Sequence, residues 1–404
     1  MRLASIVPNR MVNQIAASNA AVLLKASYLG FFSIATVGML NGPPFAGRAS
    51  LLLPAANSQT EQTSAVEPGD SSPLYERQFL ESHPDAPSVH ASTITQLRDG
   101  RMMAAWFGGS REGGKDVSIY GAFWNVQTET WDTPSVIVDA QSAGRELGRY
   151  IKKVGNPVLY CDRSGRVWLY YVTVSLGGWS GSSVSLKYSD DGGSTWSDSR
   201  RLISSPFLNV SNLVRAIPLE MSDGSVLLPV YHEFLIKCGE ILHLSPEGNL
   251  IAKYRMGNSV GALQPTLAAV DENTILAFHR STGNSYPRVL ANRSVDGGRT
   301  WSDAQPIGLP NSNSSVAVVS RNKGGFLMAL NASETERTEL SLAVSDDGID
   351  WDIIKTFPAI PNGLESSYPT LVKAADGNYH LTYTWAREKI CHIRFNDSWM
   401  EQTR

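Results

Sequence analysis

Polar residues recur at the predicted starts of six strands, and they are the residues through which this chain could do chemistry. They are His90, Asn156, Arg215, Gln264, Asn313 or Ser314, and Tyr368. A histidine can exchange a proton near neutral pH, and an arginine can bind a carboxylate through two parallel hydrogen bonds. If the fold brings these positions together, they predict an active or binding site.

A second polar set lies in segments expected to join the second and third strands of each repeat. It comprises Gly108–Asp116 (GGSREGGKD, with Arg111 and Asp116), Tyr231–Glu233, His279–Arg280 and Trp385–Arg387. Glu365 precedes Tyr368 by three residues. If the repeats close into a ring, both sets lie on one face around the axis.

The elements that position these residues repeat along the chain. Each repeat has a strand start, an Asp-Gly-like turn and an apolar strand, with turn residues Gly100, Gly165, Gly224, Asn273, Gly324 and Gly377. Asp-Gly or Asn-Gly between alternating strands indicates a hairpin because both residues tolerate positive φ. Hairpins about fifty residues apart predict a solenoid or a propeller.

A second phrase falls between these hairpins and joins a third strand to a fourth. It is intact at Ser189–Trp196 (SDDGGSTW) and Ser294–Trp301 (SVDGGRTW), shorter at Ser345–Trp351, and eroded at Asn125–Trp131 and Ser245–Gly248. Its Asp can accept hydrogen bonds from turn amides, and its Trp can pack on its own repeat.

Six repeats of four strands therefore fill residues 90–404. The last repeat has no room for a fourth strand, which Leu74–Leu80 is expected to supply, closing the ring and protecting its edges. The prediction is an all-β fold, a six-bladed β-propeller of four-stranded antiparallel blades.

Composition argues against some partners and leaves function open. Among 404 residues, 35 basic and 38 acidic side chains give a net charge of −3, whereas nucleic acid or an anionic membrane would favour a basic excess. Cys161, Cys238 and Cys391 lie far apart without a metal-ligand spacing, so we expect buried, unreactive thiols. No metal or nucleotide cofactor is indicated, and a monomer is expected.

The N-terminus predicts export to the periplasm or the extracellular space. Arg2, Arg10 and Lys25 precede the apolar stretch Ala26–Leu40, and small residues follow up to Ser50. Residues 1–50 thus read as a signal peptide, or as an uncleaved membrane anchor because the basic region is long. Residues 51–73, rich in Ser, Thr, Gln and Pro, are expected to be a disordered linker before a domain at 74–404.

The SxDxGxTW phrase resembles the Asp-box of the sialidase superfamily, and the resemblance covers roughly the last 330 residues. The phrases HAST, WFGG and DV in the first repeat, and SYPTL and YTWAR in the last, are similar to those of bacterial sialidase-like proteins. Asp-boxes occur in propellers of several activities and lie away from the catalytic face, so their aspartates are expected to be structural.

The resemblance implies roles for individual residues. A retaining sialidase uses a Tyr nucleophile activated by a Glu, an Asp as acid/base, and three arginines that bind the substrate carboxylate. Tyr368 matches the nucleophile, Asp116 the acid/base and Arg280 one arginine. The other residues expected to bind substrate are Arg215, Arg111, Arg387, Asn156, Gln264 and Trp385.

Three departures from the superfamily pattern stand beside these matches. His90-Ala91-Ser92 replaces the Arg-Ile-Pro of the first blade, Gln264 replaces the nucleophile's Glu partner, and Asn311–Ser315 contains no arginine. Glu365 is the alternative residue that could take the proton of Tyr368, and His90 is a candidate catalytic residue because it stands where an arginine would bind the carboxylate.

Three functions fit this pattern. The first is an exo-acting, sialidase-like glycoside hydrolase that cleaves glycans at terminal acidic sugars. The second is a uronate-directed lyase or a rhamnosyl-glucuronate-cleaving enzyme, similar to related propellers that rely on a histidine. There His90 or Tyr368 would be the base, Arg280 or Arg215 would neutralise the carboxylate, and Asp116 would protonate the leaving oxygen. The third is a propeller that binds glycan without catalysis.

Overall fold

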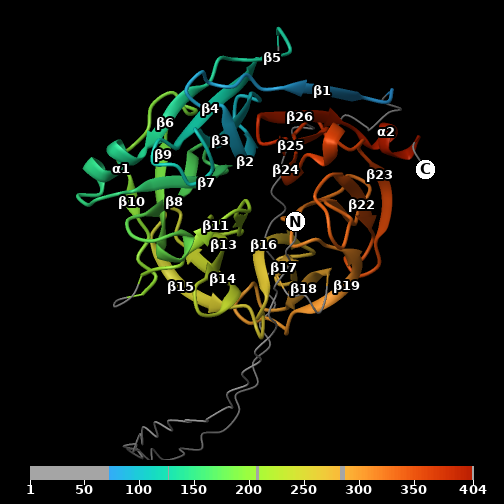
Figure 1. Ribbon diagram of the computed structural model, residues 1–404. Helices are drawn as coiled ribbons and strands as arrows, with labels where there is room; N and C mark the ends of the chain where they lie inside the picture. The colour runs from blue at the N-terminus through green and yellow to red at the C-terminus, as the bar shows by residue number, and fades with distance from the viewer. Residues whose placement is uncertain (1–71, 126, 206–208, 283–286, 403–404) are drawn as a thin grey trace, which may run out of the picture. The chain divides into compact units, whose positions relative to one another are not determined.

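Six antiparallel sheets stand around a central axis, as Figure 1 shows in a view down that axis. The computed structural model describes residues 72–402 except 126, 206–208 and 283–286. Each sheet is one blade, so the six-bladed β-propeller predicted from the repeats is confirmed. The predicted signal peptide or anchor at 1–50, and residues 51–71 of the predicted linker, lie outside the described residues.

The first three blades contain strands β2 to β15. Blade 1 has β2 (Ser88–Gln96), β3 (Met102–Gly109), β4 (Ser118–Asn125) and an outer strand split into β5 (Thr130–Trp131) and β6 (Ser135–Asp139). Blade 2 has β7 (Lys153–Cys161), β8 (Val167–Val174), β9 (Ser182–Ser189) and β10 (Arg200–Arg201). Blade 3 has an inner strand split into β11 (Leu213–Val214) and β12 (Leu219–Glu220), then β13 (Val226–Glu233), β14 (Lys237–Leu244) and β15 (Leu250–Arg255).

The other three blades contain β16 to β26 and β1. Blade 4 has β16 (Ala262–Ala269), β17 (Ile275–Ser281), β18 (Arg288–Ser294) and β19 (Gln305–Pro310). Blade 5 has β20 (Ala317–Ser320), β21 (Phe326–Leu330), β22 (Ser341–Ser345) and β23 (Asp352–Thr356). Blade 6 has β24 (Ser366–Lys373), β25 (Tyr379–Trp385), β26 (Lys389–Phe395) and β1 (Tyr75–Phe79).

The ring closes through β1, which pairs antiparallel with β26 from Tyr75 opposite Phe395 to Phe79 opposite Cys391. This pairing confirms that the segment Leu74–Leu80 supplies the last strand of blade 6. The closing strand is held at its start as well, because the backbone N–H of Leu74 donates to Asn396 Oδ1 at 3.0 Å.

The hydrophobic core lies between adjacent blades. All eight residues of β3 and all eight of β8 are buried, because these strands are covered on both faces by neighbouring blades. Strands that are buried on both faces lose the alternation of polar and apolar residues and read as continuous apolar runs.

A bulge recurs in the inner strand of four blades and sets which side chains meet at the axis. The pairing register shifts at His90/Thr93, Gly155/Val158, Leu263/Thr266 and Ser367/Thr370. Inside these bulges Ala91, Asn156, Gln264 and Tyr368 adopt φ values of 51°, 46°, 54° and 56°. Such left-handed non-glycine residues are uncommon and cluster at functional sites. The position equivalent to Tyr368 in blade 1 is therefore Ala91, and His90 lies one residue before it.

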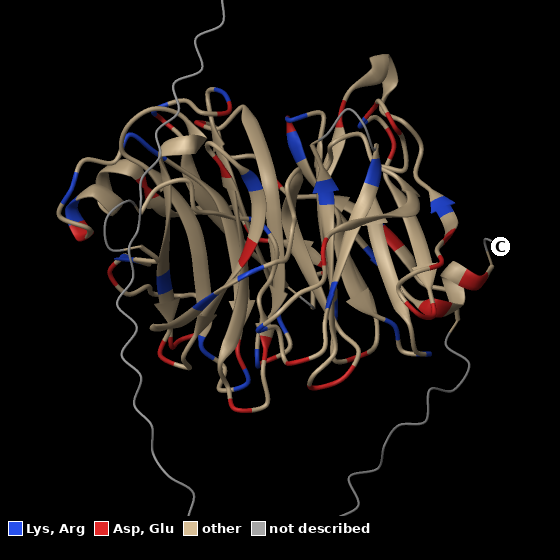
Figure 2. Cartoon of the chain, turned by 90° about the horizontal axis from the view of Figure 1, so that it is seen from below, with Lys and Arg blue, Asp and Glu red and all other residues tan. Residues whose placement is uncertain are grey.

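The Asp-Gly turns and the Asp-box-like loops lie at the opposite end of the blades, where Figure 2 shows loops with Asp and Glu in red. Asp191 accepts hydrogen bonds from the backbone N–H and the hydroxyl of Thr195, at 2.8 and 2.6 Å. Asp296 accepts the same two bonds from Thr300. These bonds lower the pKa of each aspartate to about 2. Both carboxylates are thus occupied by their own loops.

Two short helices interrupt the all-β pattern, and the repeats alone did not predict them. Helix α1 (Ala140–Glu146) follows blade 1, with Asp139 accepting from the N–H of Ser142 at its start and Gly148 at φ 60° after its end. Helix α2 (Asp397–Glu401) follows β26. In the part of the chain that the structure describes, no helix is both long and apolar enough to cross a membrane.

Two buried histidines lie where blade 6 meets blade 1. His380 Nδ1 is 3.0 Å from His392 Nε2, and Trp131 Nε1 of blade 1 donates to His392 Nδ1 at 3.3 Å. With one proton shared between the two facing nitrogens, both rings are uncharged. Burial lowers the pKa of His380 to about 4 and that of His392 well below 6.5.

We therefore expect acid to destabilise this seam between the blades. The folded-state pKa of His380 lies below its unfolded value, so its contribution is complete above about pH 6.5 and is lost as the pH falls toward 4. The loss from this ring is up to about 3 kcal/mol, at about 1.4 kcal/mol per pKa unit. Urea unfolding between pH 8 and 4 measures it. His380→Gln should flatten the dependence, whereas the partly exposed His83→Gln should keep the wild-type slope. Equal slopes in all three proteins would refute this assignment.

Candidate functional site

A polar cavity of about 200 Å³ opens around the axis, at the end of the propeller where the inner strands begin. Five blades contribute its lining, which consists of His90, Glu112, Asn156, Trp179, Leu213, Tyr231, Glu233, Gln264, Arg280 and Tyr368. The structure thus brings together His90, Asn156, Gln264, Arg280 and Tyr368 from the predicted set. Tyr231 and Glu233 come from one of the predicted loops.

Tyr368 is held at its hydroxyl by Arg280. The Nη1 atom of Arg280 donates to Tyr368 Oη at 3.1 Å and to Gln264 Oε1 at 3.3 Å, and its Nε donates to Asn313 Oδ1 at 2.5 Å. A cation that donates to Oη would stabilise negative charge developing on that oxygen. Gln264, which the resemblance matched to a glutamate, has an amide oxygen that accepts a hydrogen bond but cannot take up a proton from the phenol.

A second tyrosine, Tyr231, forms the floor of the cavity between two amides. Its hydroxyl accepts from Asn156 Nδ2 and from Gln264 Nε2, each at 3.2 Å. Burial, followed by the nearby carboxylate of Glu233, raises the pKa of Tyr231 above its ordinary value. Tyr231 is therefore a neutral hydrogen-bonding group in this site.

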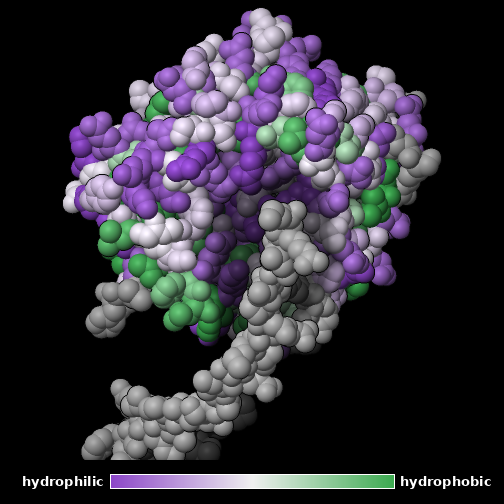
Figure 3. All heavy atoms as spheres, in the orientation of Figure 1, coloured by the Kyte–Doolittle hydropathy of each residue, from purple (hydrophilic) through white to green (hydrophobic). Residues whose placement is uncertain are grey.

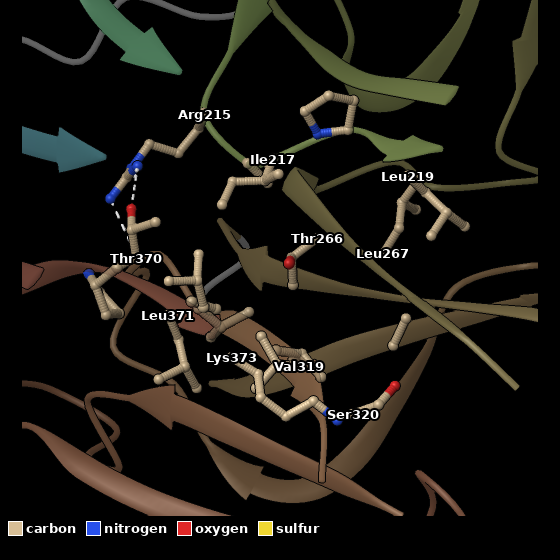
Figure 4. A pocket seen from close by; sticks show the side chains of 18 of the residues that line it. Arg215, Ile217, Leu219, Thr266, Leu267, Val319, Ser320, Thr370, Leu371 and Lys373 are labelled. Carbon is tan, nitrogen blue, oxygen red and sulfur yellow. Dashed lines mark hydrogen bonds between the residues drawn. The ribbon is translucent and has the colours of Figure 1, made fainter. Parts of the chain in front are cut away.

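Arg215 lies beneath Tyr368 and does not line the polar cavity. Its guanidinium donates to the carbonyl oxygens of Tyr368 at 2.6 Å and Pro369 at 3.1 Å, and to Thr370 Oγ1 at 3.1 Å. Figure 4 shows this side chain reaching from blade 3 to blade 6 at the edge of a second, largely apolar cavity of about 330 Å³. Burial lowers the pKa of Arg215 to about 10. Both of its Nη atoms donate to the bulge strand that contains Tyr368, so Arg215 positions Tyr368.

His90 lies at the edge of the cavity, only 3% exposed, with its ring centroid 4.3 Å from that of Tyr368. Neither ring nitrogen has a hydrogen-bond partner among the described residues. Burial, reinforced by Arg387, Arg215 and two other arginines, holds the pKa of His90 well below 6.5. The ring is therefore neutral, and proton exchange near neutral pH is not expected at this position.

Glu365 lies away from the Tyr368 hydroxyl. Its Oε2 accepts from Arg387 Nε at 2.8 Å, and its other oxygen accepts from the hydroxyl of Ser367. Arg387 also pairs with Glu112 of blade 1. Among the described residues no hydrogen bond joins Glu365 to Tyr368. The three charged groups form a bridge between blades 6 and 1 beside the cavity.

Asp116 is exposed and does not line the polar cavity. It accepts from the backbone N–H of Ser110 at 2.6 Å and from the Ser110 hydroxyl at 3.0 Å. These bonds, the backbone one first, lower the pKa of Asp116. Glu112, from the same GGSREGGKD loop, reaches the cavity instead. The sequence contained this glutamate, but nothing in the spacing distinguished it from Asp116.

The remaining predicted residues lie outside the cavity. Arg111 is exposed on the blade 1 loop, and Trp385 packs edge-on against Phe79 with ring centroids 5.3 Å apart. Trp179 and Leu213, which do line the cavity, had no sequence signal. Among the described residues, no group of three or more His, Cys, Asp or Glu side chains could hold a metal ion.

The site therefore combines one arginine, two carboxylates, two tyrosines, two amides and a neutral imidazole. The carboxyl group of Glu233 has neither an ion pair nor a hydrogen bond with any described residue. Such a set can bind a polyhydroxylated molecule, place a phenol at a reacting carbon and move a proton.

Solved structures with the same fold include three that share about an eighth of this sequence. A Hadza microbial sialidase has a TM-score of 0.64 at 14% identity, with 78% of this chain and 66% of that chain covered. An intramolecular trans-sialidase from Ruminococcus gnavus has a TM-score of 0.62 at 14% identity, covering 78% and 96%. A Dyadobacter fermentans protein of unknown function has a TM-score of 0.64 at 12% identity, covering 80% and 98%.

A search of curated proteins gives no match to this sequence. The family model described as BNR repeat-like domain matches residues 100–381, which is more than half of the chain. The repeat found in the sequence, the six blades and this match agree. The chain belongs to the BNR repeat-like domain family and has the sialidase-like propeller fold.

Proposed function

We propose that this protein is a glycoside-cleaving enzyme that binds an acidic sugar in the polar cavity and uses Tyr368 as its nucleophile. The observation that carries the proposal is the 3.1 Å bond from Arg280 to Tyr368 Oη inside a cavity that also contains two carboxylates. The sialidase and trans-sialidase structures of the same fold support it.

The chemistry divides between three side chains. Tyr368 Oη attacks the anomeric carbon while the glycosidic C–O bond breaks and its electron pair goes to the leaving oxygen. Glu233, whose carboxyl group has no partner among the described residues, gives that oxygen a proton. Glu112, the second carboxylate of the cavity, receives the phenol proton directly or through water. In the second step water attacks the anomeric carbon and Glu233 takes the proton of that water. The bond from the anomeric carbon to Tyr368 Oη breaks, and Oη takes back its proton from Glu112.

The second candidate function is a propeller that binds glycan without cleaving it. The observation that favours it is Gln264, which stands at 3.3 Å from Arg280 where a carboxylate partner of the nucleophile would be expected. A uronate lyase based on His90 has less support. Its neutral ring could accept a proton, but a lowered pKa makes it a weak base at neutral pH.

Removal of the Tyr368 hydroxyl tests the proposal. The full chain is incubated with sialyl-glycans and with rhamnosyl-uronate oligosaccharides, and the products are identified by mass spectrometry. Tyr368→Phe should reduce turnover roughly a hundredfold or more while binding persists, because the ring is kept and only the nucleophilic oxygen is lost. Tyr188→Phe is the matched control, because Tyr188 lies near the end of β9, away from the cavity, and its loss should leave turnover unchanged. Full activity in Tyr368→Phe would reject the nucleophile. An unsaturated uronate would establish the lyase, and binding without any product would establish the binding propeller.

The role of Glu233 has its own test. A substrate with an alkoxide leaving group needs the proton, whereas a nitrophenyl glycoside does not. We expect Glu233→Gln to lower kcat about a hundredfold or more on the oligosaccharide and little on the nitrophenyl glycoside of the same sugar. Glu272→Gln, in a turn at the other end of blade 4, should match the wild type. A similar loss on both substrates would mean that Glu233 binds the sugar rather than protonating it.

A further inference from the structure

A groove of about 500 Å³ is lined by segments of blades 1 and 2 and the connection between them. Its walls are the blade 1 loop at 115–118, the start of α1 and the segment 149–152. Three basic residues, Lys115, Arg149 and Lys152, line it together with Tyr150, whose side chain is 64% exposed. In Figure 3 hydrophilic residues (purple) cover this region of the molecule, over α1.

The cations of the groove are not neutralised by the protein. Lys115, Arg149 and Lys152 form no ion pair with any described carboxylate, and the only bond of Lys152 Nζ is to the Gly177 carbonyl at 3.2 Å. Arg149 also lies close enough to Arg201 to contribute, after burial, to lowering the pKa of that guanidinium. An excess of basic over acidic side chains raises the potential of a groove and favours an anionic ligand.

The two carboxylates of the groove are already engaged in their own loops. Asp116 accepts two hydrogen bonds from Ser110, and Asp139 accepts from the N–H of Ser142 at 2.7 Å as the cap of α1. Neither is directed at the basic side chains. The lining of the groove thus contains three basic and two acidic side chains beside an exposed aromatic ring, an excess of positive charge in a chain whose net charge is −3.

The groove and the cavity share two walls. The blade 1 loop places Glu112 in the cavity and Lys115 in the groove. The segment entering β7 places Lys152 in the groove and Asn156, four residues later, in the cavity. Between them Lys153 Nζ lies 3.8 Å from the centre of the Trp179 ring, which itself lines the cavity. A ligand longer than one sugar can extend from one to the other.

The other side of the cavity has a different character. Glu233 is followed by Phe234, Leu235 and Ile236, which are 55%, 86% and 55% exposed in the loop between β13 and β14. Figure 3 shows hydrophobic residues (green) over blade 3, away from α1. A charged glycan that extends out of the cavity therefore binds more favourably along blades 1 and 2 than along the apolar loop of blade 3.

We propose that the groove is a binding subsite for a carboxylate or sulfate group on an acidic glycan, two or more sugars from the unit in the cavity. Lys115 and Arg149 bind the anion, and the Tyr150 ring packs on a sugar face. This proposal rests on the proposed function only for the sugar in the cavity. The substrate class that follows is a polyanionic oligosaccharide rather than a single acidic sugar on a neutral glycan.

Calorimetric titration of the full chain tests the subsite. The probes are a hexamer of galacturonic acid, an α2,8-linked sialic acid hexamer, a chondroitin sulfate hexasaccharide, the acidic monosaccharides and the neutral maltohexaose. At least one anionic hexamer should bind more tightly than its monosaccharide and than maltohexaose, and the difference should shrink with added salt. The doubly substituted Lys115→Gln/Arg149→Gln protein should bind that hexamer about five- to tenfold more weakly and the monosaccharide unchanged.

The matched control removes two positive charges at the opposite end of the blades, in Arg98→Gln/Arg299→Gln, and should bind as the wild type does. Equal binding of the hexamer by the groove variant and the wild type overturns the subsite, as does equal weakening in both variants. The uronate and sulfate arms identify which anion the groove prefers. Hexamer binding lost in the groove variant with no turnover by the wild type supports the subsite and rejects the enzyme. Turnover that is lost in Tyr368→Phe but unchanged in the Lys115→Gln/Arg149→Gln variant supports the enzyme and rejects the subsite.

Discussion

The pairing of β1 with β26 is the constraint on which the site depends. The cavity joins His90 of blade 1 to Tyr368 of blade 6, and these two blades are neighbours only because the chain returns to close the ring. The bridge from Glu365 through Arg387 to Glu112 crosses the same seam. Without the closing strand, the first and last blades would be free ends of an open row. A centroid separation of 4.3 Å between an imidazole and a phenol would then not be maintained.

Within the closed ring, the bulges decide what the axis contains. A β-bulge inserts one residue and redirects its side chain, and here the inserted residue has a left-handed backbone in four blades. Each such non-glycine residue costs on the order of 1 kcal/mol or more, so the fold tolerates strain where side chains converge. Proline follows Asn156, Gln264 and Tyr368 directly, and its fixed φ restricts the backbone on the other side of the bulge.

The blade number, the closing strand and the inner polar ring could be predicted because they follow from repeated turns and from strand periodicity. The repeat pattern placed His90 at the same strand position as Asn156, Gln264 and Tyr368, but His90 lies one residue before that position. A bulge changes the pairing register without changing the alternation of side chains, so this offset could not be predicted. In blade 1 the bulge residue is Ala91, which carries no functional group. The same one-residue difference places His90 against Tyr368, in a buried environment that the sequence could not show.

The loops were less predictable than the strands, because a loop carries several titratable residues and its backbone decides which of them turns inward. In GGSREGGKD, Asp116 folds back on Ser110 and Glu112 points to the cavity. Arg215 shows the same limit for the inner strand. Its type suggested carboxylate binding, but its two Nη atoms donate to two carbonyl oxygens and a hydroxyl of the neighbouring bulge strand.

The charge of the cavity follows from these assignments and separates the site from an arginine-rich one. Among the described residues Arg280 is the only arginine that lines it, together with two carboxylates, and Arg387, Arg215 and Arg337 act on His90 from behind the lining. The groove adds attraction for an anionic glycan outside the cavity, because among the described residues its cations Lys115, Arg149 and Lys152 form no ion pair. Long-range attraction and local chemistry would thus reside in adjacent surfaces. The groove draws in a charged chain, and Arg280 is left to act on the Tyr368 hydroxyl.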